Sequence, residues 1–139
     1  IKVVDSSETE QRGIKLSFTP YDMCYDVQSQ RIYCIDYKNR KLNCIDRDGN
    51  IIFSFADTNV TNLHRITIDN DGNVLVLCIK RGDSLDCVIK VNSGGKLSEV
   101  VITNIEMPDI FSCMSFHRLT NTVVIGVDTY VYIYKEDPK

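Results

Sequence analysis

Long hydrophobic runs are missing from this sequence of 139 residues. The longest apolar runs, such as the stretch at positions 74–79, stop at six residues, which is too short to cross a bilayer. The N-terminus also lacks the charged-then-apolar pattern of a signal peptide, because residue 1 opens directly into Ile-Lys-Val-Val-Asp. We therefore expect no membrane partner, and either a signal that has been removed or a chain that is a fragment.

A strong excess of positive charge is also missing. The formal net charge is −3, which argues against a basic protein that coats nucleic acid but still allows a local basic face. Apolar residues make up 43% and charged residues 25%, an ordinary globular composition. The length suffices for one domain with a hydrophobic core.

The six cysteines include no Cys-x-x-Cys pair, which argues against a zinc site. Cys34, Cys44 and Cys78 lie inside apolar runs of β type, where cysteine usually acts as a small buried hydrophobe. This placement favours free thiols and a reducing, cytoplasmic compartment. The alternative is a secreted chain whose six cysteines form three disulfides.

A sustained helical period is absent as well, and short runs rich in Ile, Val, Tyr and Phe take its place. Turn sequences separate these runs: Asp-Gly-Asn at 48–50 and 71–73, and Gly-Gly at 94–95. Such spacing is typical of meandering antiparallel hairpins. The predicted fold class is therefore all-β.

The strands recur as a repeat. Asp26 and Asp69 occupy equivalent positions 43 residues apart, and His117 follows Asp69 after another 48 residues. Four strands in a period of about 40 to 50 residues indicate a blade of a β-propeller. The predicted blades are residues 20–55, 62–101 and, with three strands, 111–135. Residues 1–18 would supply the last two strands of a preceding blade, at 1–5 and 13–18.

About three blades are too few to close a propeller ring. We therefore expect a partial propeller, preferably the C-terminal half of a larger one that associates with its missing half. The second possibility is a homodimer. Counting from Gly13, each copy would supply twelve strands, and two copies would form a six-bladed ring.

Two segments carry a family resemblance. Ile-Thr-Ile-Asp-Asn-Asp-Gly-Asn-Val-Leu-Val at 66–76 and the stretch from Tyr25 to Ile45 resemble the NHL repeat, in particular the C-terminal six-bladed propellers of TRIM-NHL proteins, including invertebrate and molluscan ones. The third repeat departs from the pattern at 117–121, where the Asp-x-x-Gly turn is missing. The resemblance implies a non-catalytic module that binds protein or RNA, in some members as the substrate-recognition part of a ubiquitin ligase.

Several motifs that suggest chemistry have simpler explanations. The loops at 46–50 and 69–73 place glycine at the fourth position rather than at the sixth position of an EF-hand, so we interpret them as hairpin turns. His64 and His117 occupy non-equivalent repeat positions and make a poor metal site. Cys113 and His117 on one strand would lie about 13 Å apart, too far for a nucleophile and its base. We predict no metal and no cofactor.

A basic rim is the best candidate site. In a propeller, the loops before the first strand and between the second and third strands share one rim. There the cations would neutralise phosphate or carboxylate groups and the tyrosines would stack on a ligand. The opposite rim is acidic, with Asp26, Asp46, Asp48, Asp69 and Asp71. The predicted ligand-binding residues of the basic rim are Tyr21, Tyr37, Lys38, Arg40, His64, Arg65, Lys80 and Arg81.

Two other functions remain open. Arg81-Gly82-Asp83 spells an adhesion motif, and with the glycosylation sequon at Asn59 it would suit an extracellular interaction domain. Turns favour Gly and Asp, however, and the tripeptide falls where a hairpin must turn. A propeller enzyme of the lyase or lactonase type would require a bound metal.

Overall fold

A computed structural model describes residues 2–4, 11–80, 86–105, 112–127 and 129–136, with the side chains of 2–4, 11, 12 and 80 excepted. Thirteen strands lie within these ranges. They are β1 (Lys2–Val4), β2 (Gln11–Gly13), β3 (Met23–Asp26), β4 (Arg31–Asp36), β5 (Lys41–Ile45), β6 (Ile51–Phe55), β7 (Val60–Ile68), β8 (Val74–Lys80), β9 (Asp86–Val91), β10 (Ser98–Ile105), β11 (Ser112–His117), β12 (Thr122–Val127) and β13 (Tyr130–Lys135).

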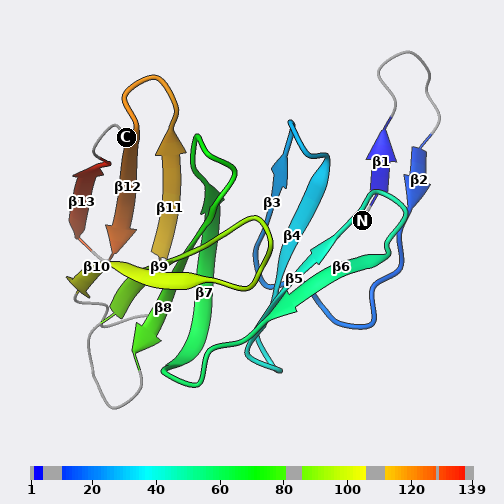
Figure 1. Cartoon of the computed structure of the whole chain (residues 1–139), viewed down its shortest axis with the longest axis horizontal. Coiled ribbons are helices and arrows are strands. Elements are labelled where there is room, and N and C mark those ends of the chain that lie inside the picture. The colour runs from blue at the N-terminus through cyan, green and yellow to red at the C-terminus, as the bar shows by residue number, and fades with distance from the viewer. Residues whose placement is uncertain (1, 5–10, 81–85, 106–111, 128, 137–139) are drawn as a thin grey trace.

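The strands form antiparallel sheets in chain order. Two four-stranded sheets have the orders β3-β4-β5-β6 and β7-β8-β9-β10, followed by a three-stranded sheet β11-β12-β13. β1 and β2 make a two-stranded sheet at one end of the row (Figure 1). The all-β prediction and the meander of four-stranded sheets are confirmed. In the described ranges no helix is long and apolar enough to cross a membrane.

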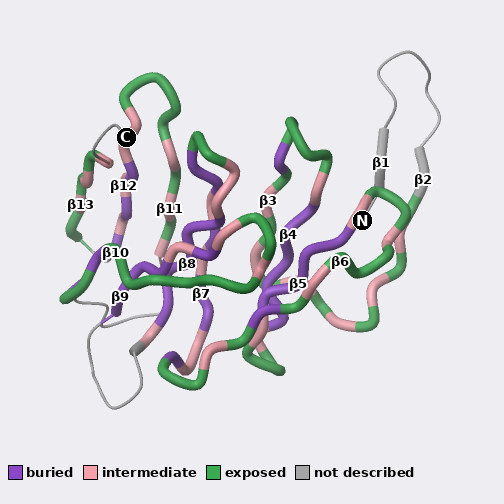
Figure 2. Tube along the Cα trace, viewed as in Figure 1, coloured by how far each residue is buried: buried purple, intermediate pink, exposed green. Residues whose placement is uncertain are grey.

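The central strands are apolar at consecutive positions because both faces of their sheets are covered. Residues Val74 to Cys78 of β8 all have 0% exposure. Figure 2 shows this as continuous buried tube along parts of β4, β5, β8 and β9, with exposed colour at the turns. Consecutive side chains of a strand point to opposite faces of the sheet, so alternate residues of such a run pack against the neighbours on its two sides.

Two hydrophobic clusters hold the three larger sheets together. In one, Tyr33 and Leu42 of the first sheet pack with Val76 and Ile89 of the second. In the other, the alternate residues of the second sheet, such as Leu77, pack with the third sheet. The middle sheet is therefore stabilised from both sides.

The first strands of the three larger sheets lie next to one another, with β7 between β3 and β11. The backbone N–H of Ile66 in β7 donates a hydrogen bond to Oδ2 of Asp22, 3.0 Å away, just before β3. The side chain of Arg65 donates from Nε to the carbonyl oxygen of Ser112 in β11 at 2.8 Å. These bonds place side chains from different sheets side by side at one end of the strands.

The expected strand at 13–18 is wrong. The partner of β1 is β2, in which Gln11 pairs with Val4 and Gly13 with Lys2, and residues 14–18 are not a strand. Leu16 and Phe18 instead pack against Ile32, Cys34 and Ile45 on the outer face of the first sheet. The alternating apolar pattern at 14–18 therefore reflects packing of an irregular segment, and eleven described strands, not twelve, follow Gly13.

Candidate ligand-binding site

Tyr21 is fixed by the start of the first sheet. Its backbone N–H donates to the carbonyl oxygen of Ile35 at 2.9 Å, and the N–H of Ile35 donates to the carbonyl oxygen of Asp22 at 2.9 Å. These bonds extend the pairing of β3 and β4 by two residues beyond Met23. Tyr21 remains 39% exposed.

Tyr37 opens the turn between β4 and β5. The buried carboxylate of Asp36 accepts hydrogen bonds from the backbone and side-chain nitrogens of Asn39, at 3.2 and 2.8 Å. The N–H of Arg40 donates to the carbonyl oxygen of Tyr37 at 3.2 Å, and Arg40 has a φ of 55°. The turn is thus well defined, and Lys38 and Arg40 are exposed on it.

An irregularity in β7 positions His64 and Arg65. The register with β8 shifts between Val60 and Leu63 and again between Leu63 and Arg65, so His64 has no paired partner residue across the ladder. Bulges of this kind re-aim side chains at the ends of sheets. His64 points toward the first sheet, where its ring centroid lies 5.9 Å from that of Tyr37.

Four predicted site residues therefore come together, and we call Tyr21, Tyr37, His64 and Arg65 the tyrosine cluster. The rings of Tyr21 and Tyr37 stack with centroids 4.6 Å apart and an angle of 28°. His64 meets Tyr21 edge-on at 6.5 Å. The guanidinium carbon of Arg65 lies 5.3 Å from the ring centroid of Tyr21, within the range of a cation–π contact.

The electrostatics of the tyrosine cluster favour an anion. His64 is 3% exposed, and neither of its ring nitrogens has a hydrogen-bond partner in the part of the chain that the structure describes. Burial and the neighbouring Arg65 lower the pKa of His64, which keeps the imidazole neutral at pH 7. Arg65 supplies the cluster's positive charge, and Lys38 and Arg40 add two more on the adjoining turn.

Two predicted site residues are not tested by this geometry. Lys80 ends β8 opposite Val60, but its side chain is not among those described. Arg81 lies outside the described residues, as do Gly82 and Asp83 of the adhesion motif. Their membership of the rim stays a prediction.

At the opposite ends of the strands, the two Asp-x-Asp-Gly-Asn segments are hairpin turns, as predicted. Oδ1 of Asp46 accepts from the N–H groups of Asp48 and Asn50, both at 2.9 Å. Asp69 binds the equivalent N–H groups of its own turn at the same distances. The carboxylates therefore satisfy the turn backbone, which explains the repeated motif without a metal.

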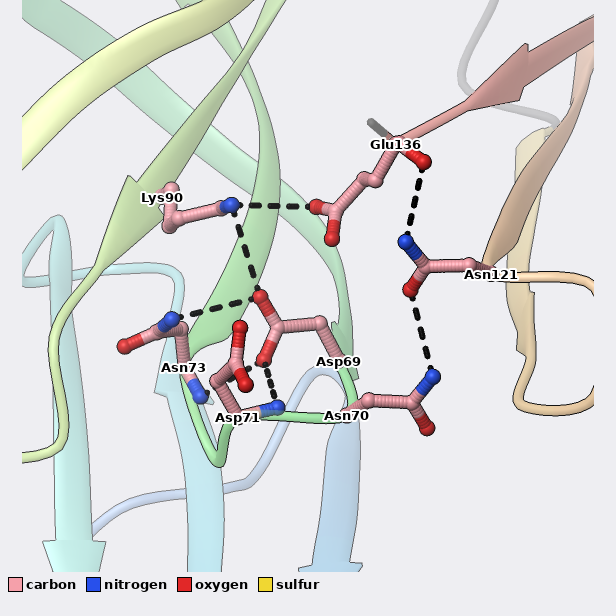
Figure 3. Close-up of polar contacts among 7 residues, drawn as sticks. All are labelled: Asp69, Asn70, Asp71, Asn73, Lys90, Asn121 and Glu136. Carbon is pink, nitrogen blue, oxygen red and sulfur yellow. Dashed lines mark hydrogen bonds and ion pairs between the residues drawn. The ribbon is translucent and has the colours of Figure 1, made fainter. Parts of the chain in front are cut away.

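One network of polar side chains at these ends of the strands could not be predicted from the sequence (Figure 3). Nζ of Lys90 lies 3.5 Å from Oδ2 of Asp69 and 3.1 Å from Oε1 of Glu136. The side-chain amide of Asn70 donates to Oδ1 of Asn121 at 3.2 Å. The network joins β9, the β7–β8 turn and the third sheet beside a cavity of about 590 Å³.

His117 and Cys113 do not form a catalytic pair. Both are exposed on β11, where Cys113 opposes Gly126 and His117 opposes Thr122. Nδ1 of His117 shares a hydrogen bond of 2.8 Å with the hydroxyl of Thr120 instead. Their separation along the strand is as expected.

Comparison with known proteins identifies the architecture. No family model matches the sequence, and no curated protein matches it. The virginiamycin B lyase from Staphylococcus aureus, solved as a catalytically inactive variant with quinupristin, has a TM-score of 0.52 over 86% of this chain and 42% of its own. A streptogramin B lyase also has a TM-score of 0.52, over 86% of this chain and 41% of its own. The fold is that of a β-propeller.

The likeness is one of fold alone, because the sequence identities are 15% and 14%. The chain spans less than half the length of these propellers, and its three larger sheets correspond to about three blades. These neighbours show a propeller fold but do not show whether its repeats are NHL repeats, so that resemblance stays a prediction.

Proposed function

We propose that the chain is a non-catalytic recognition module that binds single-stranded RNA through the tyrosine cluster and the adjoining Lys38 and Arg40. The observation that carries the proposal is the exposed ring of Tyr21, stacked on Tyr37 at 4.6 Å with Arg65 beside it. A base can continue a stack that already exists. Aromatic stacking contributes roughly 1–3 kcal/mol per base, with little dependence on sequence.

The charges around the rings suit a phosphate backbone. Lys38 and Arg40 are exposed on the turn that begins at Tyr37, and Arg65 lies beside Tyr21. The net charge of the chain is −3, so the positive charge is local rather than general. Arginine and lysine neutralise phosphates and release condensed counterions, which supplies most of the affinity for a nucleic acid. An acidic protein segment would use the same cations but would gain less from stacked rings, so RNA is the better-supported ligand.

The test is fluorescence anisotropy with a short, labelled single-stranded RNA of mixed sequence. Tyr21→Leu removes the outer stacking ring, and Arg40→Glu reverses a charge on an exposed turn. We expect each change to weaken binding about tenfold or more. Lys96→Glu is the matched control, because Lys96 is exposed on the β9–β10 turn, at the acidic end of the strands.

Three outcomes separate the hypotheses. Loss of binding in the two rim variants with retention in the control supports the proposal. Equal loss in Arg40→Glu and Lys96→Glu would indicate a general charge effect and contradict it. Binding of a labelled poly-glutamate peptide but not of RNA would assign the rim to a protein partner.

Two wider assignments accompany this proposal. A role as the substrate-recognition part of a TRIM-type ubiquitin ligase depends on the resemblance to NHL repeats. A cytoplasmic location depends on the absence of disulfides among the cysteines. The enzyme alternative can be tested separately, by incubating the protein with quinupristin and comparing the chromatographic retention of the compound before and after. Retention is the readout because a lyase can open a cyclic compound by elimination without changing its mass. No new peak is expected, since His64 is enclosed by its neighbours rather than presented to a substrate.

A further inference from the structure

Cys78 and Cys87 face each other across two strands of the middle sheet. They are register partners in the β8–β9 pair, and their sulfur atoms lie 3.6 Å apart. Their exposures are 0% and 1%. None of the six cysteines is in a disulfide in the structure, so this pair is close but not covalently bonded.

The backbone geometry is already suitable for a disulfide. Directly opposed residues of antiparallel strands have Cα atoms about 4.5 or 5.5 Å apart, within the range of about 4.4–6.8 Å found for disulfides. The sulfurs must approach by roughly 1.5 Å to reach bonding distance, which rotation about the two Cα–Cβ bonds can supply. No shift in strand register is needed.

The other buried cysteines lack this arrangement. Cys34 opposes Asn43, and Cys44 opposes Tyr33, in the same pair of strands. Cys44 belongs to the cluster between the first two sheets, whereas Cys34 belongs to the cluster on the outer face. They lie on opposite faces of their sheet and provide natural controls.

We propose that Cys78 and Cys87 form a reversible dithiol–disulfide pair, a modification site at the base of the 79–86 hairpin. The oxidant would be a low-molecular-weight disulfide. The Cys78 thiolate attacks one sulfur of that disulfide and displaces the first small thiolate. The Cys87 thiolate then attacks Sγ of Cys78 and displaces the second. Two protein thiols become one disulfide, the small disulfide is reduced to two thiols, and the two cysteine protons pass to them.

The surroundings make the reaction slow without preventing it. Hydrogen bonding with Cys87 and burial raise the pKa of Cys78, and the carboxylates of Asp86 and Asp57 add to the effect. Thiolate is therefore scarce, and attack requires local opening of the hairpin. Cys78 and Cys87 lie two and one residues from the ends of their strands, where opening is least costly.

The bond would close a small ring that includes Lys80, at the end of β8, and Arg81 of the predicted rim. Oxidation would thereby restrict the backbone of the two strands where they enter the segment that joins them. The thiol chemistry itself does not depend on RNA binding, so the two proposals can fail independently.

The experiment uses the folded chain with Cys113→Ser, because Cys113 is exposed and would form mixed disulfides. The protein is equilibrated with mixtures of reduced and oxidised glutathione, quenched with acid, unfolded and alkylated. We expect two fewer alkylated thiols at the oxidising end and a cross-linked peptide that joins Cys78 to Cys87. Return to the reduced mixture should restore both thiols.

Matched variants keep the result interpretable. Cys34→Ala should show the same loss of two thiols, whereas Cys87→Ala should show no intramolecular bridge. If either variant fails to fold, Cys44→Ala and Cys78→Ala take the same roles. Retention of all thiols in the oxidising mixture, or a bridge between other cysteines, would overturn the proposal.

Discussion

Asp86 is a buried carboxyl group whose environment does not support its charge. It is 1% exposed, and its Oδ2 has no hydrogen-bond partner in the described part of the chain. Burial raises the pKa of Asp86 to about 7. The ordinary value in an unfolded chain is about 3.9. Between these two values the folded state binds a proton that the unfolded state does not.

Replacement of this carboxyl should therefore have a pH-dependent effect. The folded protein gains stability as the pH falls from 7 toward 4, and above pH 7 it carries the cost of a buried charge. We expect Asp86→Asn to stabilise the protein by about 1–3 kcal/mol at pH 8, with a benefit that shrinks toward pH 4. Urea unfolding at a series of pH values measures the difference. Parallel curves for the two proteins would contradict this assignment.

His64 changes the stability of the folded protein with pH in the opposite direction. Its lowered pKa means that the unfolded chain binds a proton more readily, so this residue removes stability as the pH falls below about 6.5. The two side chains partly offset each other in the wild-type protein. Single variants are therefore needed to see either effect.

At the scale of strands and turns, the two Asp-x-Asp-Gly-Asn turns form a natural pair. Both carboxylates bind the same positions of their turns, but Asp69 is buried beneath Lys90, whereas Asp46 is only half-buried. We expect Asp69→Ala to destabilise the protein by about 1–3 kcal/mol, because the ammonium group of Lys90 and the turn N–H groups lose a partner away from water. Asp46→Ala should cost less. Equal costs in chemical denaturation would show that the turn, not the network, sets the contribution.

A second pair concerns glycine. Gly95 and Gly72 have φ angles of 73° and 80°, which disfavour side chains to a similar extent. A methyl group at Gly95 would also overlap the ring of Phe53 in the first sheet, whereas at Gly72 the nearest atom is 3.9 Å away. We expect Gly95→Ala to lower stability by about 1–3 kcal/mol more than Gly72→Ala. Thermal unfolding of both variants provides the comparison, and equal losses would exclude the steric effect.

Among the features of strands and turns, the turn positions and the strand order can be predicted from the sequence. Asp-Gly-Asn and Gly-Gly fix hairpins locally, and consecutive apolar residues indicate sheets covered on both faces. The strand expected at 13–18 is wrong because alternation looks the same in a strand and in an irregular segment packed on a sheet. Only the tertiary partner distinguishes the two, and here Leu16 and Phe18 pack on the first sheet rather than pairing with β1.

At the scale of the whole molecule, the repeat brings separate parts of the candidate site into register. It predicts Tyr21, Tyr37, His64 and Arg65 as loop residues of one rim. The structure brings the four residues together, but His64 and Arg65 lie within strand β7 rather than in a loop before it. The bulge that buries His64 could not be predicted, because it depends on pairing between β7 and β8. The Lys90 network is unpredictable for a similar reason: Lys90 and Glu136 belong to different parts of the fold and no local motif links them.

Exposed apolar residues on β6 and β13, which are edge strands of their sheets, predict that the chain associates. Val131 and Ile133 of β13 are 66% and 69% exposed, and Ile51 and Ile52 of β6 are 62% and 42% exposed. Blades normally cover such surfaces, so in the isolated chain we expect a second copy to do so. Light scattering after size exclusion should give a mass about twice 15.9 kDa. The Ile133→Lys variant should give a lower mass. A concentration-independent monomer would contradict association through these faces.

We propose that the rim binds single-stranded RNA through phosphate contacts and stacked rings, and the salt dependence of binding provides the sharpest test. With about three cations engaged, the logarithm of the binding constant should fall with the logarithm of salt concentration at a slope of about −2. Arg40→Glu should remove about one phosphate contact and so make the slope shallower by about 0.7. Tyr21→Leu should weaken binding but leave the slope unchanged. A slope near zero, or no RNA binding at low salt, would show that the rim does not bind RNA through phosphate contacts.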